Sequence, residues 1–251
     1  MEHVAISWGK TFDGTIEFVS LTKSRLKEAL EVLKTSFYPQ ENVCKATGLA
    51  FMSNAMEECK DMVMGAAKCG VSIIAIDKIT QKVVGVLLNK IQHKDTSSKK
   101  LFEKHIKNTK YDQVKGLYEF LLEMEEKVNP FSPYQADCLL EMVFLGVPSE
   151  YARRGIGFGL CKASIDLAKC LYKGENVKTS LTDTPLPLQP VPQIVTVFFT
   201  TYKSQGIGRK LNMDILEKVS CDELFFRGKS YASILGNETE YFTIECQSLK
   251  V

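Results

Sequence analysis

The residues best suited to chemistry lie past the middle of the chain, where positions 151 to 159 read YARRGIGFG. The three glycines lack the β-carbons that would otherwise hold a ligand away from the backbone. The apolar run Leu139 to Val147 before this stretch is typical of a strand, and the residues after it are typical of a helix. Backbone N–H groups at a helix start attract an anion, and the arginine pair adds two positive charges beside them. The stretch therefore predicts a turn that binds a polyphosphate.

Two familiar phosphate motifs do not match this turn. A Walker loop ends in Gly-Lys-Ser or Gly-Lys-Thr, whereas these glycines lead into Phe158, Leu160 and Cys161. A Rossmann fingerprint normally lies in an early strand-helix unit with an acidic residue about 20 residues further on, and this turn comes late in the chain. A glycine-rich turn also lets a helix pack closely on a sheet, so the glycines alone leave a purely structural role open.

Aligned on its glycines, the turn resembles the Arg/Gln-x-x-Gly-x-Gly/Ala motif of the GCN5-related N-acetyltransferase superfamily. In that superfamily, the strand before the turn and the amides of the turn hold the pantetheine and pyrophosphate of acetyl-CoA. The first Arg or Gln of the motif is Ala152 here, which removes one side-chain contact but leaves the amides in place. The resemblance implies acetyl-CoA as cosubstrate, held by Leu145, Gly146, Val147, Arg153, Arg154, Gly155, Ile156, Gly157, Phe158 and Gly159.

A narrower resemblance involves the segment Phe37-Tyr38-Pro39-Gln40-Glu41. Insect arylalkylamine N-acetyltransferases and their relatives place an acidic residue after an aromatic pair at this point. An alkylammonium with a pKa of about 10 must lose a proton before it can attack a thioester, so the reaction needs a base. The resemblance implies that Glu41 is this base and that Phe37 and Tyr38 bind the amine. Without the resemblance, Glu41 is typical of a helix-terminal or loop glutamate that faces water.

Several hydroxyl groups follow a late apolar run, in the segment Phe199 to Ser204. The insect enzymes place serines here that shape the site and help to protonate the departing CoA thiolate. The resemblance extends these roles to Thr200 and the retained Ser204, because a threonine hydroxyl can also donate a hydrogen bond. Tyr202 is a further candidate proton donor, because other members of the wider superfamily use a tyrosine in this neighbourhood. Helix capping by Thr201 or Ser204 is an equally weighted alternative.

One motif occurs twice, because Tyr151-x-x-x-Gly-Ile-Gly-x-x-Leu160 recurs as Tyr202-x-x-x-Gly-Ile-Gly-x-x-Leu211. Only the first copy is preceded by two arginines and followed by a third glycine. It also leaves enough chain for a late strand, a helix and a closing hairpin. We therefore assign the phosphate to the first copy, and we expect Gly206 and Gly208 inside the late helix, by coincidence or to allow close packing.

Composition limits the other functional classes. The chain has 251 residues, of which 45% are hydrophobic, so we expect one domain that spans residues 1–251. A net charge of +2 with interleaved acidic and basic residues argues against nucleic-acid binding. The eight cysteines occur singly and are expected to be reduced, mostly buried thiols. The three histidines lack metal-ligand spacing, so no metal is expected.

The location of the protein is predicted from what the sequence lacks. Met1 to Val4 do not begin a signal peptide, and no apolar run approaches membrane-spanning length. We therefore expect a cytoplasmic protein that does not enter a membrane. The sequence predicts no oligomeric state.

Hydrophobic periodicity predicts strands and helices intermixed along the chain. The expected fold class is α+β, with a mixed, mostly antiparallel central sheet of about seven strands flanked by helices, which matches the fold of the superfamily. Strands are expected at 15–20, 71–76, 82–91, 139–147, 194–200, 225–226 and 241–246. Helices are expected at 23–35, at 49–69, within 101–128 as one or two, after the glycine turn up to Lys169, and at 204–211. Residues 92–100 and the proline-rich segment 172–193 are expected to form loops.

The resemblance implies direct acetyl transfer to the primary amine of a small arylalkylamine or related biogenic amine. Phe37, Tyr38 and nearby methionines favour an apolar or aromatic substrate. A polyamine or agmatine is an alternative, for which Glu57 and Glu58 are candidate carboxylates. A protein or peptide amine, a longer acyl donor, and a catalytically silent acyl-CoA-binding module also stay open.

Overall fold

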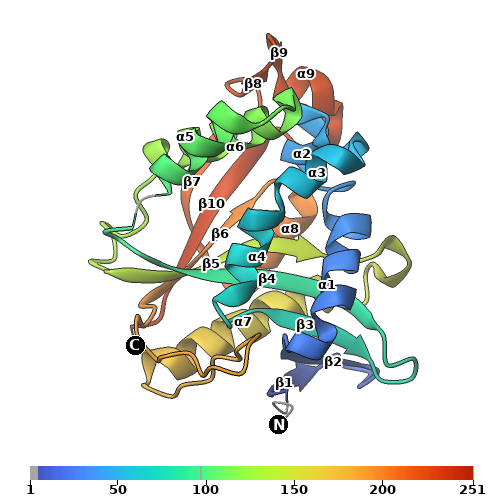
Figure 1. Cartoon of the computed structure of the whole chain (residues 1–251), viewed down its shortest axis with the longest axis vertical. Coiled ribbons are helices and arrows are strands. Elements are labelled where there is room, and N and C mark those ends of the chain that lie inside the picture. Colours follow the sequence, from blue (N-terminus) through green and yellow to red (C-terminus); the bar gives the residue numbers. More distant parts are fainter. Residues whose placement is uncertain (1–4, 97, 251) are drawn as a thin grey trace.

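The computed structural model describes residues 5–96 and 98–250, so Met1 to Val4 and one position of the predicted 92–100 loop lie outside the described residues. Eight strands form one sheet in the order β1-β2-β3-β4-β5-β6-β10-β7 (Figure 1). Neighbouring strands are antiparallel except β5 and β6. The strands are β1 (Ser7–Lys10), β2 (Ile16–Ser20), β3 (Ile73–Asp77), β4 (Val83–His93), β5 (Cys138–Gly146), β6 (Ile194–Phe199), β7 (Asp214–Ser220) and β10 (Tyr241–Ser248).

The parallel strands β5 and β6 separate before they end. Their pairing stops with Met142 opposite Val197, although β5 continues to Gly146 and β6 continues to Phe199. At this point β5 carries one extra residue relative to β4, namely Val143. Such a bulge bends a strand and increases its twist. The carboxyl ends of β5 and β6 therefore diverge, and no ladder joins these ends to each other.

Helices cover both faces of the sheet. In β4, Leu87 packs with α7 on one face, whereas Val86 and Leu88 pack with α1 and α4 on the other. No helix in the described part of the chain is both long enough and apolar enough to cross a bilayer. The helices are α1 (Leu26–Val32), α2 (Asn42–Thr47), α3 (Ser53–Glu58), α4 (Lys60–Lys68), α5 (Lys99–Asn108), α6 (Asp112–Lys127), α7 (Ile156–Tyr172), α8 (Tyr202–Leu211) and α9 (Tyr231–Leu235), with the short turns η1 (Lys23–Arg25), η2 (Leu33–Phe37), η3 (Leu49–Phe51), η4 (Ser149–Tyr151) and η5 (Gly236–Glu238).

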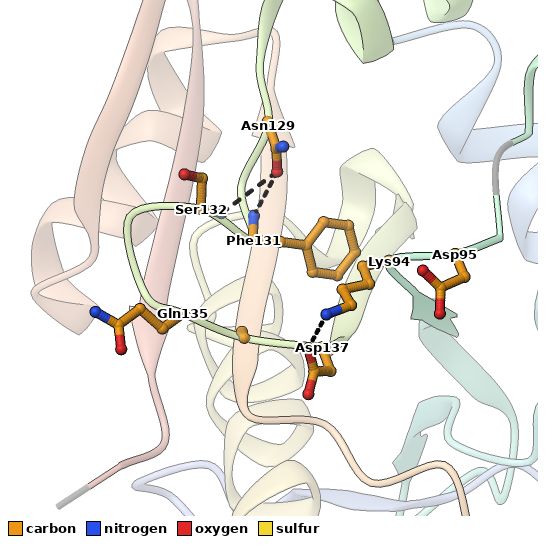
Figure 2. A pocket seen from close by; sticks show the side chains of 8 residues that line it. Lys94, Asp95, Asn129, Phe131, Ser132, Gln135 and Asp137 are labelled. Atoms are coloured by element: carbon orange, nitrogen blue, oxygen red, sulfur yellow. Dashed lines mark hydrogen bonds and ion pairs between the residues drawn. The ribbon is translucent and has the colours of Figure 1, made fainter.

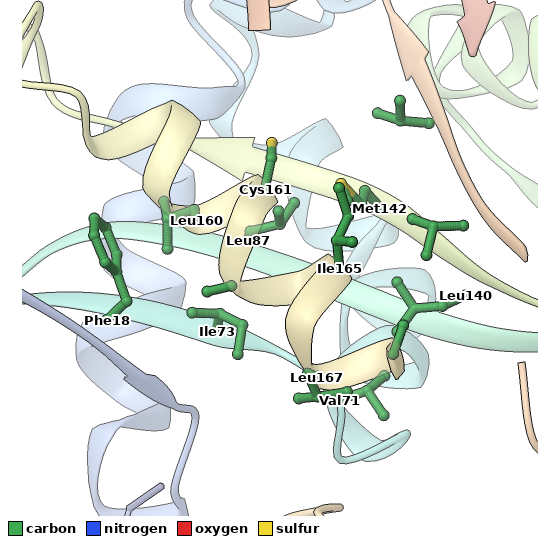
Figure 3. Packing of buried hydrophobic residues seen from close by; sticks show 14 of the residues in the cluster. Phe18, Val71, Ile73, Leu87, Leu140, Met142, Leu160, Cys161, Ile165 and Leu167 are labelled. Atoms are coloured by element: carbon green, nitrogen blue, oxygen red, sulfur yellow. The ribbon is translucent and has the colours of Figure 1, made fainter. Parts of the chain in front are cut away.

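The helix α7 anchors the largest apolar cluster. Figure 3 shows its side chains Leu160, Cys161 and Ile165 against residues of the central strands, such as Leu87 and Met142. This helix follows the glycine turn directly, so packing along its length fixes the position of the turn relative to β5. All eight cysteines are free and six are buried, as predicted.

The predicted single helix at 49–69 is wrong. The segment is divided into η3, α3 and α4, with breaks at Met52, whose backbone lies outside the helical region, and at Cys59. The physical reason is that the segment serves two separate clusters. Leu49 and Ala55 pack with α6, whereas Val63 packs with α1 and β4. A straight helix presents one apolar stripe and would not reach both clusters.

Two strands of the central sheet were missed, and both lie at its edges. Most side chains of β1 and β7 are exposed, so neither segment shows the alternation of a half-buried strand. The predicted strand Phe225–Phe226 forms as β8, but it pairs with β9 (Lys229–Ser230) in a separate hairpin and adds nothing to the central sheet.

The proline-rich segment 172–193 is a loop, as predicted, and it is tied to the body of the protein. The Lys178 ammonium donates to the carbonyls of Pro187 and Leu188, at 3.0 and 2.9 Å. The Thr179 N–H donates to the carbonyl of Gly70 at 2.8 Å. The first two bonds join parts of the loop to each other, and the third holds the loop against the turn between α4 and β3.

Candidate active site

The predicted phosphate turn leads directly into α7. Gly155 precedes the helix with φ 78° and ψ 4°, a left-handed conformation that favours glycine. The N–H groups of Ile156, Gly157 and Phe158 have no hydrogen-bond partner among the described residues. The first amides of a helix lack intrahelical partners, and the helix dipole favours an anion beside them. The start of α7 therefore offers three free donors to a phosphate.

The two arginines of the turn are exposed and directly precede Gly155. The Arg154 guanidinium donates to Thr15 Oγ1 at 2.9 Å and lies 4.0 Å from Asp13 Oδ2. It also lies over the ring of Tyr151, 5.4 Å from its centroid. Arg153 has a left-handed backbone, with φ 62°. The turn between β1 and β2 thus fixes Arg154 beside the free amides.

The glycines of the turn meet different requirements. A β-carbon at Gly157 would lie 3.1 Å from Ile207 Cδ1, so this position is close to α8. A β-carbon at Gly159 would lie only 2.0 Å from the ring of Phe18. The Gly159 N–H donates to the Gly155 carbonyl at 2.9 Å. Gly159 therefore allows close packing of α7 on β2, and its amide is committed within the helix.

The end of β5 contacts both the phosphate turn and η2, the π-helical turn that ends the first helical segment. A β-carbon at Gly146 would lie 2.7 Å from Ser36 Oγ, so only glycine leaves room for η2 at this point. Leu145 Cδ2 lies 3.9 Å from the place of a β-carbon at Gly157. Val147 follows the strand and is half-buried. The predicted pantetheine residues thus lie between the two segments.

Glu41 caps the start of α2 and contacts the end of β6. Its Oε1 accepts the Val43 N–H at 2.9 Å, and its Oε2 accepts the Cys44 N–H at 2.7 Å. Thr200, the first residue after β6, donates its hydroxyl to Glu41 Oε1 at 2.8 Å. The structure therefore brings together two predicted catalytic residues that are 159 positions apart. Glu41 is also helix-terminal, as in the alternative interpretation, but it is half-buried instead of facing water.

Asn42 contacts the same threonine from the other side. Its side chain is completely buried, and its Nδ2 donates to the Thr200 carbonyl at 2.6 Å. Its Oδ1 has no hydrogen-bond partner among the described residues. Asn42 was not predicted as a site residue, because nothing in the sequence links it to a residue 158 positions away. Glu41 and Asn42 together hold Thr200 by its hydroxyl and its carbonyl.

The other predicted hydroxyls have different environments. Thr201 and Ser204 form a reciprocal capping box at the start of α8, with the Ser204 N–H donating to Thr201 Oγ1 at 3.1 Å and the Thr201 N–H donating to Ser204 Oγ at 3.3 Å. The Tyr202 side chain is 61% exposed. Its hydroxyl has no hydrogen bond to another described residue. The Ser204 hydroxyl is thus used in helix capping, whereas the Tyr202 side chain is exposed to solvent.

Aromatic and sulfur groups surround Glu41. Tyr38 is buried, and burial raises the pKa of its hydroxyl. Phe37 packs edge-on against Tyr38, with ring centroids 5.4 Å apart. The Tyr231 hydroxyl and the Cys44 thiol lie near the Glu41 carboxylate, and burial is the main cause that raises the pKa of each. These groups stay uncharged at neutral pH, so the lining near Glu41 is largely apolar.

The second Gly-Ile-Gly motif lies inside α8, which confirms the prediction for Gly206 and Gly208. A β-carbon at Gly208 would lie 1.7 Å from Glu245 Oε2, on β10. A β-carbon at Gly206 would meet only the Arg209 guanidinium, at 3.7 Å. Gly208 therefore serves close packing of α8 on the sheet.

A surface hollow of about 490 Å³ lies away from these residues, between the β4–α5 and α6–β5 connections (Figure 2). Lys94 and Asp137 form an ion pair of 2.6 Å across it, which raises the pKa of Lys94 and lowers that of Asp137. The Asn129 side chain accepts the Phe131 N–H at 3.0 Å. The Lys94, Asp137 and Asn129 side chains that line the hollow thus bond to neighbouring protein groups. None of the predicted site residues lines this hollow. Among the described residues, no group of three or more His, Cys, Asp or Glu is placed to hold a metal ion.

Comparison with known proteins identifies the fold. No family model and no curated protein sequence matches the chain. Arylalkylamine N-acetyltransferase 2 from Aedes aegypti is similar in structure, with a TM-score of 0.76 and 20% identity over 94% of this chain and 99% of that chain. A putative arylalkylamine N-acetyltransferase 7 from the same mosquito has a TM-score of 0.76 and 17% identity over 99% and 97%. Drosophila melanogaster polyamine N-acetyltransferase has a TM-score of 0.71 and 13% identity over 93% and 99%. The chain therefore has the GCN5-related N-acetyltransferase fold, as expected.

Proposed function

We propose that the chain is a single-domain N-acetyltransferase that moves an acetyl group from acetyl-CoA to the primary amine of a small arylalkylamine or related biogenic amine. One observation carries this proposal. The segment from η2 to α2 spans the diverging ends of β5 and β6, because Ser36 lies against Gly146 and Glu41 accepts a hydrogen bond from Thr200. A carboxylate is thus held at the gap between the strands, next to the strand that leads into the free amides of α7.

The residues of the turn fit the cosubstrate. A CoA pyrophosphate needs several N–H donors and nearby positive charge, and the start of α7 has both. The diverging end of β5 leaves backbone groups for the pantetheine amides. We assign acetyl-CoA binding to Leu145, Gly146, Val147, Arg153, Arg154, Gly155, Ile156, Gly157 and Phe158, with Gly159 acting through the packing of α7.

Glu41 is the proposed base. The amine enters as an ammonium and has to lose a proton before its nitrogen attacks the thioester carbonyl. The hydrogen bonds from two backbone amides and from Thr200 fix the orientation of the Glu41 carboxylate, so that little reorganisation is needed when it accepts the proton, directly or through water. Thr200 thus acts by orienting the carboxylate of the proposed base.

Tyr202 is the proposed donor to the departing CoA thiolate. Thr200 donates to Glu41, and Ser204 donates to the Thr201 carbonyl at 2.9 Å. Of the three candidate hydroxyls, the hydroxyl of Tyr202 alone makes no hydrogen bond to a described group. We retain Ser204 as the residue that shapes this end of α8.

The surroundings of Glu41 favour an apolar or aromatic amine over a diamine. Phe37, Tyr38 and Tyr231 bring rings to this region, and a second ammonium would need a second carboxylate near the first. The candidate Glu57 is exposed, and Glu58 accepts a hydrogen bond from Thr109. The Drosophila enzyme of the same fold catalyses formation of N-acetylagmatine, so agmatine is the substrate that most directly competes with this proposal.

The test is free-thiol release from acetyl-CoA across a panel of arylalkylamines, histamine, agmatine, polyamines and one lysine peptide. Rapid release with arylalkylamines alone supports the proposal. Preference for agmatine or polyamines would replace the substrate class but keep the reaction, and preference for the peptide would indicate a protein acetyltransferase. Saturable acetyl-CoA binding with no release for any amine would identify a binding module and overturn the proposal.

A further inference from the structure

Glu41, which caps α2, and Asn42, the first residue of α2, both hold Thr200, the residue that follows β6. Glu41 accepts the hydroxyl of Thr200 at 2.8 Å, and Asn42 donates to the carbonyl of Thr200 at 2.6 Å. Thr200 lies outside the ladder of β6, whose last residue is Phe199. Its main chain is therefore not fixed by the sheet at this point, and the Asn42 amide supplies the fixing contact instead.

The orientation of the Asn42 amide follows from this contact. The opposite orientation would place two acceptor oxygens 2.6 Å apart, so the nitrogen must face the Thr200 carbonyl. The oxygen then lies in the interior without a partner among the described residues. A buried amide that satisfies only its donor side gains little from burial alone. Its effect on the structure is concentrated in the one bond to Thr200.

We propose that Asn42 is a positioning residue for the base. By holding the Thr200 carbonyl, it keeps the Thr200 hydroxyl aimed at Glu41 and so sets the direction in which the carboxylate meets the amine. This inference rests on the proposed function. It assigns to Asn42 an effect on turnover that passes through Thr200, without contact between Asn42 and either substrate.

The chain contains a matched control at Asn89. This residue is also completely buried, its Nδ2 donates to the Val71 carbonyl at 2.7 Å and to Ser164 Oγ at 2.8 Å, and its Oδ1 also lacks a described partner. Asn89 joins β4 to α7 and to the segment just before β3, and it has no hydrogen bond to Glu41 or Thr200. Replacing either asparagine by leucine removes a buried amide of the same size, but only one of the two changes affects the proposed base.

The experiment measures kcat and KM with the amine that is turned over fastest in the panel, together with acetyl-CoA affinity and the unfolding midpoint. The variants are Asn42→Leu, Thr200→Val, the double variant and Asn89→Leu. We expect Asn42→Leu to lower kcat about 10- to 100-fold through misplacement of the base, with acetyl-CoA affinity within about twofold of wild type. The double variant should be no slower than the slower single variant, because Asn42 is proposed to act through the Thr200 hydroxyl, which Thr200→Val already removes. Asn89→Leu should lower the unfolding midpoint and leave kcat within about twofold of wild type.

Three results would overturn the positioning role in an active protein: an unchanged kcat in Asn42→Leu, losses that multiply in the double variant, or an equal loss in Asn89→Leu. If Asn42→Leu does not fold, Asn42→Ser gives the same test, because serine is accepted at helix starts and is too short to make the bond to Thr200. An inactive wild-type protein would instead overturn the proposed function, and the positioning role with it.

Discussion

The two copies of the Tyr-x-x-x-Gly-Ile-Gly-x-x-Leu motif differ in where the helix begins. In the first copy, Gly155 precedes α7 and the glycines lie in its first turn, where the amides are free. In the second copy, α8 begins at Tyr202, so Gly206 and Gly208 lie well inside it, where amides bond to carbonyls four residues earlier. The start of α8 is closed by the capping box of Thr201 and Ser204.

The same short motif therefore serves two sides of one proposed site. The first copy offers donors and positive charge, which suit the phosphates of acetyl-CoA. The second copy follows Thr200, which contacts Glu41, and its glycine at 208 only allows α8 to approach β10. The glycine pattern alone therefore does not indicate a phosphate site. The position of the helix start relative to the glycines decides whether their amides are free.

Replacing the proposed base, Glu41, should have the largest effect and should distinguish the amine side of the site from the acetyl-CoA side. Glu41→Gln keeps the shape of the side chain but removes its ability to accept a proton. We expect turnover to fall about 100- to 10,000-fold, the usual range for loss of a general base, while acetyl-CoA affinity at the first copy stays unchanged. Steady-state kinetics and direct titration of acetyl-CoA measure the two quantities. A parallel loss of affinity would show that Glu41 belongs to the acetyl-CoA side.

Adding a negative charge to each copy tests which one binds phosphate. Gly157→Glu puts a carboxylate among the free amides, and like charges about 6 Å apart repel by about 3 kcal/mol at an intermediate dielectric constant. We expect acetyl-CoA affinity to fall about 100-fold. Gly206→Glu has space for its side chain and should change affinity less than threefold. A larger loss in the second variant would reverse our assignment of the two copies.

Adding one methyl group tests the packing role of the second copy. The β-carbon of Gly208→Ala would overlap the Glu245 carboxyl group, and such overpacking costs about 1 to 3 kcal/mol of unfolding free energy. Gly206→Ala meets no such obstacle, and removing a helical glycine stabilises by about 0.5 to 1 kcal/mol. Urea unfolding of the two variants should therefore shift in opposite directions. Equal shifts would contradict the close approach of α8 to β10.

Much of the fold was predictable from local pattern. The alternation in β2 and the helical spacing in α1 and α7 are consequences of burial on a fixed face, and the apolar run at the start of β4 reflects burial on both faces, so the sequence records each of them directly. The edge strands β1 and β7 have little burial to record and were missed. The division of 49–69 into three elements depends on two clusters formed by distant segments, which a local pattern does not contain.

The candidate site divides in the same way. Gly155 and the arginines were recognisable because a helix start with glycines has a local signature. The contact of Glu41 and Asn42 with Thr200 joins residues that only the topology brings together, at the start of α2 and just after β6. Likewise, Gly159 is a glycine like Gly155 and Gly157, so its residue type does not reveal its role. Only its short distance to Phe18 shows that it allows helix packing and not the approach of a ligand.

The smallest expected effect concerns the buried carboxyl group beneath the second copy. Glu245 is 2% exposed, its Oε1 accepts the Thr243 hydroxyl at 2.7 Å, and burial raises its pKa despite the opposing effects of Thr243 and Arg209. Between its ordinary value of 4.5 and the raised value, the folded protein keeps a proton that the unfolded chain releases. The free energy of unfolding must then fall as pH rises through this window. The contribution of Glu245 is fully present only below pH 4.5.

Glu245→Gln isolates this contribution, because glutamine keeps the size and does not titrate. We expect wild type to lose more unfolding free energy than the variant between pH 4.5 and pH 7, by at most about 1.4 kcal/mol for each pH unit between the ordinary and the raised pKa of Glu245. Exposed carboxylates such as Asp13, whose pKa is lowered to about 2 chiefly by hydrogen bonds from Thr11 and Thr15, lose their contribution only at lower pH. They therefore leave the difference between the two curves untouched. Parallel curves would mean that Glu245 ionises as readily in the folded protein as in water, and α8 would then have to lie farther from β10 than the contact with Gly208 requires.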